Sequence, residues 1–433
     1  MNIPNNQSTL EQWVDWLLHL HAQEIDLGLE RIRLVAEKMQ VTRPAPFVIS
    51  VAGTNGKGSS VAMLASILKA AGYNVGTYTS PHILKFNERI QVNSVPVSDQ
   101  QIVDAFTAIE SQREQIKLTY FEFSTLAALT IFKQAKLDVV VLEVGLGGRL
   151  DAVNVVDADA SLITAIDVDH IDWLGDDRSL IAVEKAGIMR EGRLSICSDP
   201  NPPQTLIDYA AELQVDLACL KIDFDYQKNP LNDQAWSFNF TQDDQPAVTL
   251  TKPQLHGDFQ LQNASGVVAL LSKIRSQLAV DIEHINKGLA EVKHPGRMQS
   301  LQINHQAWLI DVAHNPQSAQ VLAEYLEKQA FEPHKSIALF SALNDKDMLP
   351  MVRVIKPFVS QWAIADLDIP RSTGLQQLTG ILLQAGVEKQ QICEFESIAL
   401  ATEYVKGCDK SNVLVWGSFF TVAQTLEELE ADK

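Results

Sequence analysis

A glycine-rich segment that contains a lysine is the strongest chemical signal in this sequence. It consists of Gly53, Thr54, Asn55, Gly56, Lys57, Gly58 and Ser59. The segment follows the apolar run 47–52 and precedes a helical pattern, and in that context backbone N–H groups and the helix N-terminus bind phosphate. Lys57 would reach the β- and γ-phosphates of a nucleotide, and the Ser59 hydroxyl could bind Mg²⁺. We therefore predict a phosphate-binding loop rather than an ordinary strand-to-helix turn.

A hydroxyl, a carboxylate and an imidazole are predicted at the ends of three further strands. These residues are Ser80, Glu143 and His170, at the ends of the runs 75–79, 138–144 and 161–166. Because parallel strands end at the same edge of a sheet, the three side chains should meet in one crevice. Such ligands suit Mg²⁺ beside the phosphates of ATP. Each residue alone has an equally good structural explanation, and only their coincidence with the phosphate loop indicates a site.

Lys185 lies on an otherwise apolar helical stretch, in the sequence VEKAGI. A lysine that packs its stem on apolar surface and extends its amine to solvent is the ordinary explanation. The residues around it do not favour another interpretation.

The elements that must position these residues alternate between short β-branched runs and helical patterns, which indicates βαβ units and a parallel sheet. From 217 to 251, polar and aromatic residues alternate instead, which is typical of antiparallel hairpins. Adjacent Pro295 and Gly296 mark a break, so we expect one domain over 1–295 and a second, smaller α/β domain over 296–433. The further strands are expected at 194–197, 307–312, 336–340, 361–365 and 412–416.

Composition excludes several classes of protein. A length of 433 residues allows two or three domains of about 150 residues each. The 35 Lys and Arg residues against 54 Asp and Glu give a net charge of -19, which argues against nucleic-acid or anionic-membrane partners. Four scattered cysteines fit neither a disulfide framework nor a zinc cluster and indicate a reducing compartment. With no secretory leader and no long apolar run, we expect a cytoplasmic protein.

Several segments taken together resemble the bacterial dihydrofolate synthase/folylpolyglutamate synthases of the Mur ligase superfamily. They are GTNGKGS at 53–59, TSPH at 79–82, EVGLGGRLDAVN at 143–154, DHIDWLG at 169–175, EKAGIMR at 184–190 and DVAHNP at 311–316. Their order is that of the family, from about residue 26 to 420. The resemblance implies an α/β fold, with a P-loop-containing Mur-ligase-like domain built on a parallel sheet and a smaller Rossmann-like domain. It also implies an active site in the cleft between the two.

The resemblance further implies roles for individual residues. ATP contacts are expected from 53–59 and from Asn263, Arg297 and Asp311, with His314 as a further candidate. Ser80, Glu143 and His170 match magnesium ligands beside Ser59. Lys185 matches a lysine that is carbamoylated and so supplies an oxygen ligand to a second Mg²⁺. The expected catalytic residues are Lys57, Glu143, His170 and Lys185.

Three segments match the family's binding site for dihydropteroate and folates. They are Asp26, Leu27, Gly28 and Leu29; Thr119, Tyr120, Phe121 and Glu122; and Leu150, Asp151 and Ala152. Phe121 could stack on a flat ring, or it could be an ordinary core aromatic. One position departs from the family, because Phe259 stands where a histidine is common, and this affects the geometry expected near the adenine.

The function implied is an ATP-dependent ligase that joins L-glutamate to dihydropteroate and to reduced folates through an acyl phosphate. ATP is its co-substrate, two Mg²⁺ ions its cofactors, and we expect a monomer. Alternatives are a folylpolyglutamate synthase only, or a Mur-type ligase of peptidoglycan precursors. The segment before Gly53 is short for the extra domain that Mur-type ligases usually carry. A P-loop kinase or GTPase, or a nucleotide-binding regulator, would leave the DVAHNP segment or Lys185 unexplained.

Overall fold

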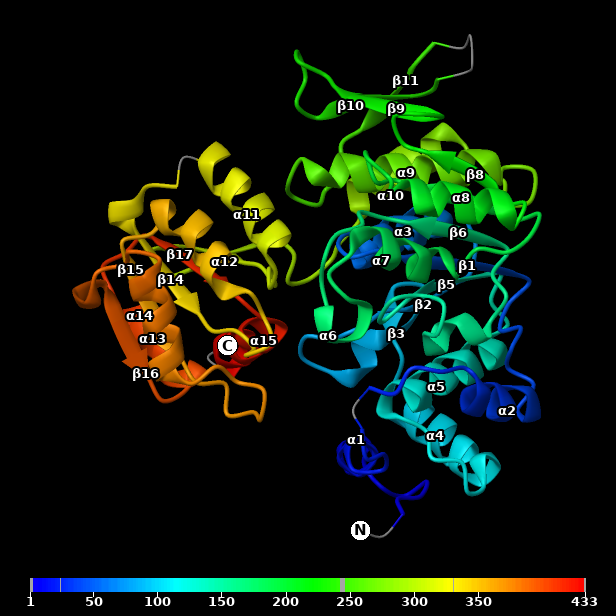
Figure 1. Ribbon diagram of the computed structural model, residues 1–433, viewed down its shortest axis with the longest axis horizontal. Coiled ribbons are helices and arrows are strands. Elements are labelled where there is room, and N and C mark those ends of the chain that lie inside the picture. The colour runs from blue at the N-terminus through cyan, green and yellow to red at the C-terminus, as the bar shows by residue number, and fades with distance from the viewer. Residues whose placement is uncertain (1–2, 24, 242–245, 330, 432–433) are drawn as a thin grey trace. The chain divides into compact units, whose positions relative to one another are not determined.

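The computed structural model describes residues 3–23, 25–241, 246–329 and 331–431, and it divides into two compact units (Figure 1). The first unit holds residues 1–254 and 260–293, and the second holds 255–259 and 294–433. The short segment 255–259 thus belongs to the second unit. Phe259, which departs from the family pattern, packs against the apolar core of that unit.

An eight-stranded sheet forms the centre of the first unit. Its order is β4 (Val95–Pro96), β3 (Ile90–Val92), β2 (Val75–Tyr78), β5 (Val139–Glu143), β1 (Phe47–Ala52), β6 (Ala160–Ile163), β7 (Leu194–Cys197) and β8 (Asp216–Cys219). The strands from β2 to β8 in this order are parallel, which confirms the predicted parallel sheet. Strands β3 and β4 add an antiparallel edge that was not predicted, since they contain only 3 and 2 residues.

Strands β1 and β5 are buried along their whole length, because helices cover both faces of the sheet. Figure 1 shows α3, α9 and α10 on one face and α4 and α5 on the other. The helices of this unit are α1 (Leu10–Leu18), α2 (Glu30–Lys38), α3 (Lys57–Ala70), α4 (Asp99–Arg113), α5 (Tyr120–Ala135), α6 (Ile171–Leu174), α7 (Arg178–Ala186), α8 (Gln204–Glu212), α9 (Phe259–Lys273) and α10 (Ile282–Glu291), with 3-10 turns η1 (Phe86–Arg89) and η2 (Ala152–Val155).

A small antiparallel sheet extends the first unit beyond α9 and α10 (Figure 1). It consists of β9 (Phe224–Lys228), β10 (Ala235–Phe240) and β11 (Val248–Thr251). The predicted hairpins are confirmed for this part, while residues 242–245 lie outside the described residues. The prediction was wrong at 217–219, because these residues belong to β8, which pairs in parallel with β7. Ala218 and Cys219 are buried, so this stretch is a core strand and not a hairpin arm.

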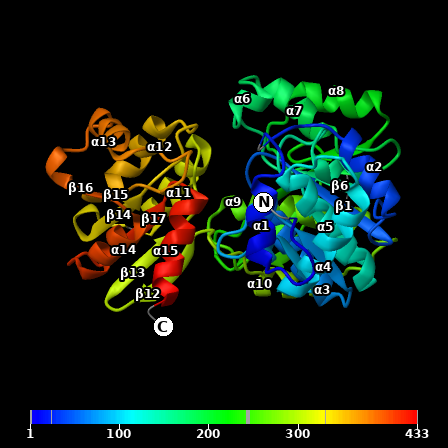
Figure 2. The ribbon, with the colours of Figure 1, turned by 90° about the horizontal axis from the view of Figure 1, so that it is seen from below.

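The second unit is built on a six-stranded sheet. Its order is β12 (Gln299–Ile303), β13 (Gln306–Ile310), β17 (Asn412–Trp416), β14 (Ser336–Phe340), β15 (Gln361–Ala365) and β16 (Ile392–Phe395). Only β12 is antiparallel to its neighbour among these strands. Figure 2 shows α11, α12 and α13 on one face and α14 and α15 on the other. Their bounds are α11 (Pro316–Lys328), α12 (Met348–Ile355), α13 (Leu375–Gln384), α14 (Ile398–Gly407) and α15 (Phe419–Ala431), with 3-10 turns η3 (Pro333–Lys335), η4 (Lys356–Phe358) and η5 (Lys389–Gln391).

Two further expectations concern the whole chain. The cysteines Cys197, Cys219, Cys393 and Cys408 are all free thiols. Within the described residues, no helix combines the length and the apolar character needed to cross a membrane.

Candidate active site

The register of the parallel strands brings the predicted residues to one edge of the first unit's sheet. The paired positions are Val51 with Glu143, Tyr78 with Leu142, and Ala52 with Ile163. The phosphate loop, the TSPH segment and the segment that leads to His170 therefore leave the sheet at the same level. This is the convergence at the carboxyl ends of parallel strands that the sequence predicted.

Two glycines let the phosphate loop pack against neighbouring segments. Gly56 precedes α3 with a φ of 91°, and a Cβ there would collide with the Asn263 side chain. A Cβ on Gly53 would collide with the Thr164 hydroxyl. Because no side chain caps the N-terminus of α3, its first N–H groups are suited to bind an anion.

The Lys57 ammonium is held against this loop. Its Nζ donates hydrogen bonds to the carbonyl oxygens of Gly53 at 3.0 Å and Thr54 at 3.2 Å. The loop itself is tied to the segment after β6, because the Thr54 hydroxyl donates to the Asp167 carbonyl at 2.8 Å. Lys57 thus places a positive charge where a phosphate chain would lie.

Gln260, which sequence reasoning did not single out, joins two predicted ATP residues. Its Nε2 donates to the buried Ser59 hydroxyl at 3.2 Å, and its Oε1 accepts from Asn263 Nδ2 at 3.0 Å. Its place in the same segment as Asn263, three residues before it, is the signal that could have identified it.

Two of the predicted magnesium ligands lie together. The backbone N–H of Ser80 donates to Glu143 Oε2 at 3.2 Å, and Glu143 is buried at the end of β5. His170 is the N-cap residue just before α6, with a φ of 54°, and its N–H donates to the Asp169 carboxylate at 2.8 Å. The hydroxyl and carboxylate oxygens are hard donors of the kind that fit Mg²⁺ or Mn²⁺. Within the described residues, no group of three or more His, Cys, Asp or Glu side chains is placed to hold a metal ion. The expected magnesium ligands would not form such a group, because only Glu143 and His170 among them are of these residue types.

Lys185 does not extend its amine to solvent, so the ordinary explanation offered for it is wrong. Only 3% of the residue is exposed on α7. Burial, followed by the positive charge of Lys57, lowers the pKa of its amine to about 7. The carboxylates of Asp169 and Asp151 act in the opposite direction. Lys185 therefore lies in the same electrostatic neighbourhood as the phosphate loop and the segment of His170.

The three segments expected to bind the pterin are brought together in the first unit. Arg31 donates to Asp26 at 2.7 Å and, through Nε, to Glu122 at 2.8 Å. The Gly28 N–H donates to the Leu150 carbonyl at 3.3 Å, which adds the third segment. Sequence reasoning missed Arg31, because its contact with Glu122 spans 91 positions and leaves no local pattern.

Two buried carboxyl groups in these segments could accept hydrogen bonds from a ligand. Glu122 Oε1 is buried and has no hydrogen-bond partner within the described residues. Burial raises the pKa of the Asp151 carboxyl to about 6, although N–H groups of Leu146 at 2.8 Å and Val153 at 2.9 Å donate to it. An unpaired acceptor inside a fold calls for a donor, and a ligand can supply one.

The aromatic residue expected to stack on the pterin is partly exposed. Phe121 packs on the edge of the core, with its ring centroid 6.0 Å from that of Tyr78. A Cβ on Gly145 would lie 2.6 Å from the Phe121 ring, so this glycine allows the loop after β5 to lie on the ring. The core and the stacking interpretations both fit this position.

Three predicted residues form a cluster of their own in the second unit. The Arg297 guanidinium lies 5.3 Å from the Phe419 ring centroid, and the His314 ring lies 5.7 Å from it. Asp311 is buried, which raises the pKa of its carboxyl, and it accepts N–H bonds from Met298 and Ala313 at 2.8 Å each. Phe419 is the shared contact that sequence reasoning missed.

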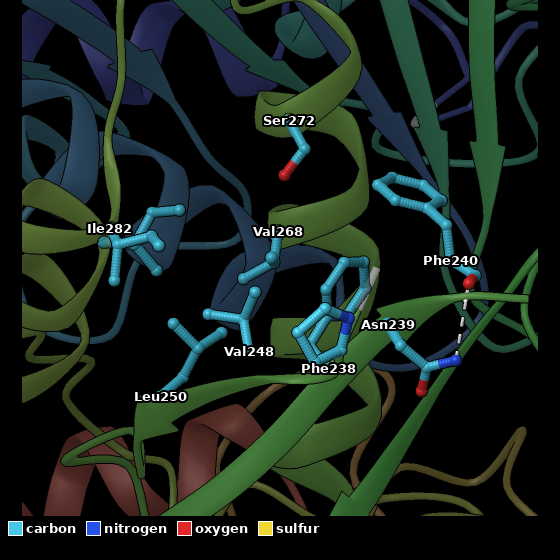
Figure 3. A pocket seen from close by; sticks show the side chains of 10 residues that line it. Phe238, Asn239, Phe240, Val248, Leu250, Val268, Ser272 and Ile282 are labelled. Atoms are coloured by element: carbon cyan, nitrogen blue, oxygen red, sulfur yellow. Dashed lines mark hydrogen bonds between the residues drawn. The ribbon is translucent and has the colours of Figure 1, made fainter. Parts of the chain in front are cut away.

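A separate cavity of about 130 Å³ lies between the small antiparallel sheet and the helices α9 and α10 (Figure 3). Its lining residues are Phe238, Asn239, Phe240, Pro246, Val248, Leu250, Val268, Ser272, Ile282 and Ile285. None of these lining residues carries a charge or belongs to the predicted site. The cavity does not suit ATP or glutamate.

Comparison with known proteins agrees with this geometry. Residues 51–271 match the Mur ligase middle domain, and 296–419 match the Mur ligase glutamate ligase domain. The dihydrofolate synthase/folylpolyglutamate synthase of Escherichia coli K12 is 40% identical over 433 residues, covering 99% of this chain and 97% of that protein.

Solved structures agree as well. The structure of E. coli FolC in complex with DHPP and ADP is 40% identical, with a TM-score of 0.90 and 99% of each chain covered. The bifunctional enzyme of Yersinia pestis, complexed with AMPPNP and a Mn ion, is 38% identical, with a TM-score of 0.89, covering 99% of this chain and 100% of that one. With this fold, this site and this identity over its full length, the chain belongs to the dihydrofolate synthase/folylpolyglutamate synthase family of ATP-dependent ligases.

Proposed function

We propose that this chain joins L-glutamate to dihydropteroate and to reduced folates, with ATP, at the carboxyl edge of the first unit's sheet. The observation that carries the proposal is the contact between Ser80 and Glu143 at the level where the phosphate loop begins. One edge then offers a phosphate site and a metal site, and the segments for the pterin lie in the same unit.

The reaction has two steps. A substrate carboxylate oxygen attacks the γ-phosphorus of ATP, which forms an acyl phosphate and releases ADP. The amine of L-glutamate then attacks the acyl carbon, the amide bond forms, the C–O bond to phosphate breaks, and the amine loses a proton. Phosphoryl transfer mainly requires charge neutralisation and alignment, and no protein nucleophile is needed.

Lys57 is assigned to charge neutralisation, because its ammonium already lies on the loop that would surround the phosphates. The loop from Gly53 to Ser59 and Asn263 would hold the nucleotide, and the collision that a Cβ on Gly56 would cause shows how closely they pack. In the second unit, Arg297, Asp311 and His314 are assigned to ATP as well. The contacts of Arg297 and His314 with the Phe419 ring, and the electrostatic interaction of Asp311 with Arg297, support this assignment.

Ser59, Ser80, Glu143 and His170 would hold Mg²⁺, which neutralises phosphate charge when it is bound. Lys185 is assigned to a second ion as a carbamate. The uncharged Lys185 amine would add to carbon dioxide, forming an N–C bond and losing a proton, and so become an anionic oxygen donor. Its burial and the low pKa of its amine support this step, because only the uncharged amine is nucleophilic.

The acceptor substrate is assigned to Asp26–Leu29, Thr119–Glu122 and Leu150–Ala152. The buried, unpartnered Glu122 Oε1 and the Asp151 carboxyl suit the amino and ring N–H donors of a pterin. Since every residue assigned here comes from one chain, the proposal requires no second copy. Size-exclusion chromatography coupled to light scattering tests the expected monomer.

The test is turnover by the purified chain. With ATP, Mg²⁺, L-glutamate and either dihydropteroate or tetrahydrofolate, we expect ADP release and a product heavier by one glutamyl residue in mass spectrometry. ADP release without glutamate would indicate a kinase instead. Turnover with tetrahydrofolate but not with dihydropteroate would indicate a folylpolyglutamate synthase only. Removal of Mg²⁺ with EDTA should stop the reaction with either acceptor.

A further inference from the structure

Two arginines of the first unit are buried to the same degree but differ in the hydrogen bonds and ion pairs that their guanidinium groups make. Arg89 and Arg113 each have 7% of their surface exposed. A guanidinium stays charged at neutral pH, and a buried charge is costly unless it is paired and hydrogen bonded. What compensates each charge is therefore informative.

Arg113 is fully satisfied by its own fold. Its Nε and Nη2 donate to the Glu110 carboxylate at 2.6 and 2.8 Å, and its Nη1 donates to the Ile116 carbonyl at 2.8 Å. The guanidinium also lies over the Trp16 ring, 5.6 Å from its centroid. This is the usual solution for a buried arginine.

Arg89 has no such pairing. Its Nε donates to His82 Nδ1 at 2.7 Å, and its guanidinium lies over the rings of Phe86 and Tyr120, 5.7 and 5.3 Å from their centroids. Throughout the part of the chain that the structure describes, its two terminal nitrogens make no hydrogen bond and no carboxylate pairs with it. The open end of the guanidinium is thus left for something outside the chain.

The position of Arg89 indicates which kind of ligand could bind the open end of its guanidinium. Its carbonyl accepts the Thr79 N–H at 2.9 Å, next to Ser80 of the assigned metal site. Tyr120, on which it lies, belongs to the segment assigned to the acceptor substrate. Arg89 therefore contacts both the loop that carries Ser80 and the segment that would hold the pterin.

We propose that the two terminal nitrogens of Arg89 bind a carboxylate of the substrate that accepts glutamate. The proposal rests on the function proposed above. A guanidinium presents two parallel N–H donors that match the two oxygens of a carboxylate. The acceptor carries such a group at the end remote from its pterin, and no carboxylate of the described chain competes for Arg89.

The surroundings of Arg89 also fix its direction before a substrate binds. The two aromatic rings confine the guanidinium, and the bond from Nε to His82 sets its rotation. A donor pair that is already held in place loses little conformational entropy when the substrate binds. The substrate therefore binds more tightly than it would to a mobile side chain. Arg89 is on these grounds a substrate-binding residue with an effect on the acceptor alone.

The experiment compares steady-state kinetics of Arg89→Met and Arg113→Met with those of the unaltered chain. Arg89→Met keeps the apolar stem on the rings and removes the donors. Because hydrogen bonds to charged groups are strong, its KM for the acceptor should rise about tenfold or more, with the KM values for ATP and glutamate unchanged. Arg113→Met should lower the unfolding midpoint and leave the acceptor KM unaltered.

Two acceptors distinguish which carboxylate is bound. Dihydropteroate has only the carboxylate that is activated, whereas tetrahydrofolate also has the α-carboxylate of its glutamate. A rise confined to tetrahydrofolate identifies the α-carboxylate, and a rise with both identifies the carboxylate that reacts. An unchanged KM for both acceptors in Arg89→Met overturns the proposal.

If Arg89→Met does not fold, Arg89→Lys replaces it. That variant keeps the charge and loses the paired donors, so its acceptor KM should still rise while its KM for ATP stays constant. An unchanged acceptor KM in Arg89→Lys overturns the proposal equally. An unaltered chain without glutamate-dependent ADP release would contradict the proposed function, which separates the two failures.

Discussion

The two ends of the site in the first unit are held together by different means. At the phosphate end, formed by 53–59 and Asn263, glycines bring segments so close that one added methyl group would collide. At the pterin end, formed by 26–31, 119–122 and 150–152, the ion pairs of Arg31 tie Asp26 to Glu122, and a backbone hydrogen bond from Gly28 to Leu150 adds the third segment. The first end thus depends mainly on close packing, whereas the second depends on ion pairs as well. Variants should therefore fail in different ways at the two ends.

Loss of the Lys57 charge should have the largest effect, because both reactions pass through the phosphate end. In Lys57→Met, kcat should fall about 10³-fold with either acceptor, as expected when a donor to transition-state charge is removed. The KM for the acceptor should change little. Steady-state assays with dihydropteroate and tetrahydrofolate measure both quantities.

Lys69→Met is the matched control for this variant. Lys69 is on the same helix, α3, and its Nζ donates to the Asn93 carbonyl at 3.0 Å. Its loss should leave both kcat values near those of the unaltered chain. A Lys57→Met variant that kept a tenth of the activity would remove Lys57 from the proposed chemistry.

Removal of Lys185 should have the next largest effect. In Lys185→Ala, kcat should fall about 10²-fold, because an oxygen donor to the metal would be lost. Acetate should restore part of the activity, since a small carboxylate can enter the space left by the side chain. The same acetate should not restore Lys57→Met, in which a cation is missing. Full activity of Lys185→Ala would contradict the carbamate.

The same difference between the two ends explains what could be predicted from the sequence. The phosphate loop is a continuous segment after a strand, and its neighbours follow from the rule that parallel strands end together. Ser80 and Glu143 were placed correctly for that reason. The contact from Arg31 to Glu122 joins α2 to α5 across 91 positions, and no local pattern encodes it.

Burial was the second limit of sequence reasoning. Lys185 lies on α7 and Phe121 at the start of α5, and at both positions the residue pattern alone allows an exposed or a buried side chain. The structure buries Lys185, because Gly148 of the loop 145–149 packs on the backbone of α7. It leaves Phe121 partly exposed, although Gly145 of the same loop lies on the Phe121 ring. The side of a helix that a distant loop covers is set by the tertiary fold.

Alanine substitutions of two glycines that flank α3 test whether the phosphate end depends on close packing. Gly56 and Gly72 have φ values of 91° and 90°, so alanine should cost either site about 1 to 2 kcal/mol in the free energy of unfolding. A Cβ on Gly72 would meet nothing within 4 Å, whereas one on Gly56 would collide with Asn263. Gly56→Ala should therefore be the less stable variant in urea denaturation, and it alone should raise the KM for ATP. Equal losses would show that Asn263 moves aside freely.

The pterin end should show the smallest effect, measured as a coupling between charges. A double-mutant cycle of Arg31→Met and Glu122→Gln should give a coupling of about 1 kcal/mol in the free energy of unfolding, within the range for contacting pairs. The exposed pair Lys38 and Glu114 is the reference, since its side chains are 42% and 73% exposed against 24% and 4% for Arg31 and Glu122. That surface pair should give a clearly smaller coupling, because solvent screens it.

Kinetics then decide whether this coupling serves the acceptor. Arg31→Met releases both Asp26 and Glu122 from their shared cation, so the loop that carries Asp26 is no longer tied to α5. The KM for dihydropteroate should rise severalfold, and the KM for ATP should not, because the phosphate end contains none of these charges. A coupling no larger than that of the surface pair, or an equal rise in both KM values, would mean that charge does not organise the pterin end separately. The two ends would then have to be treated as one packed structure.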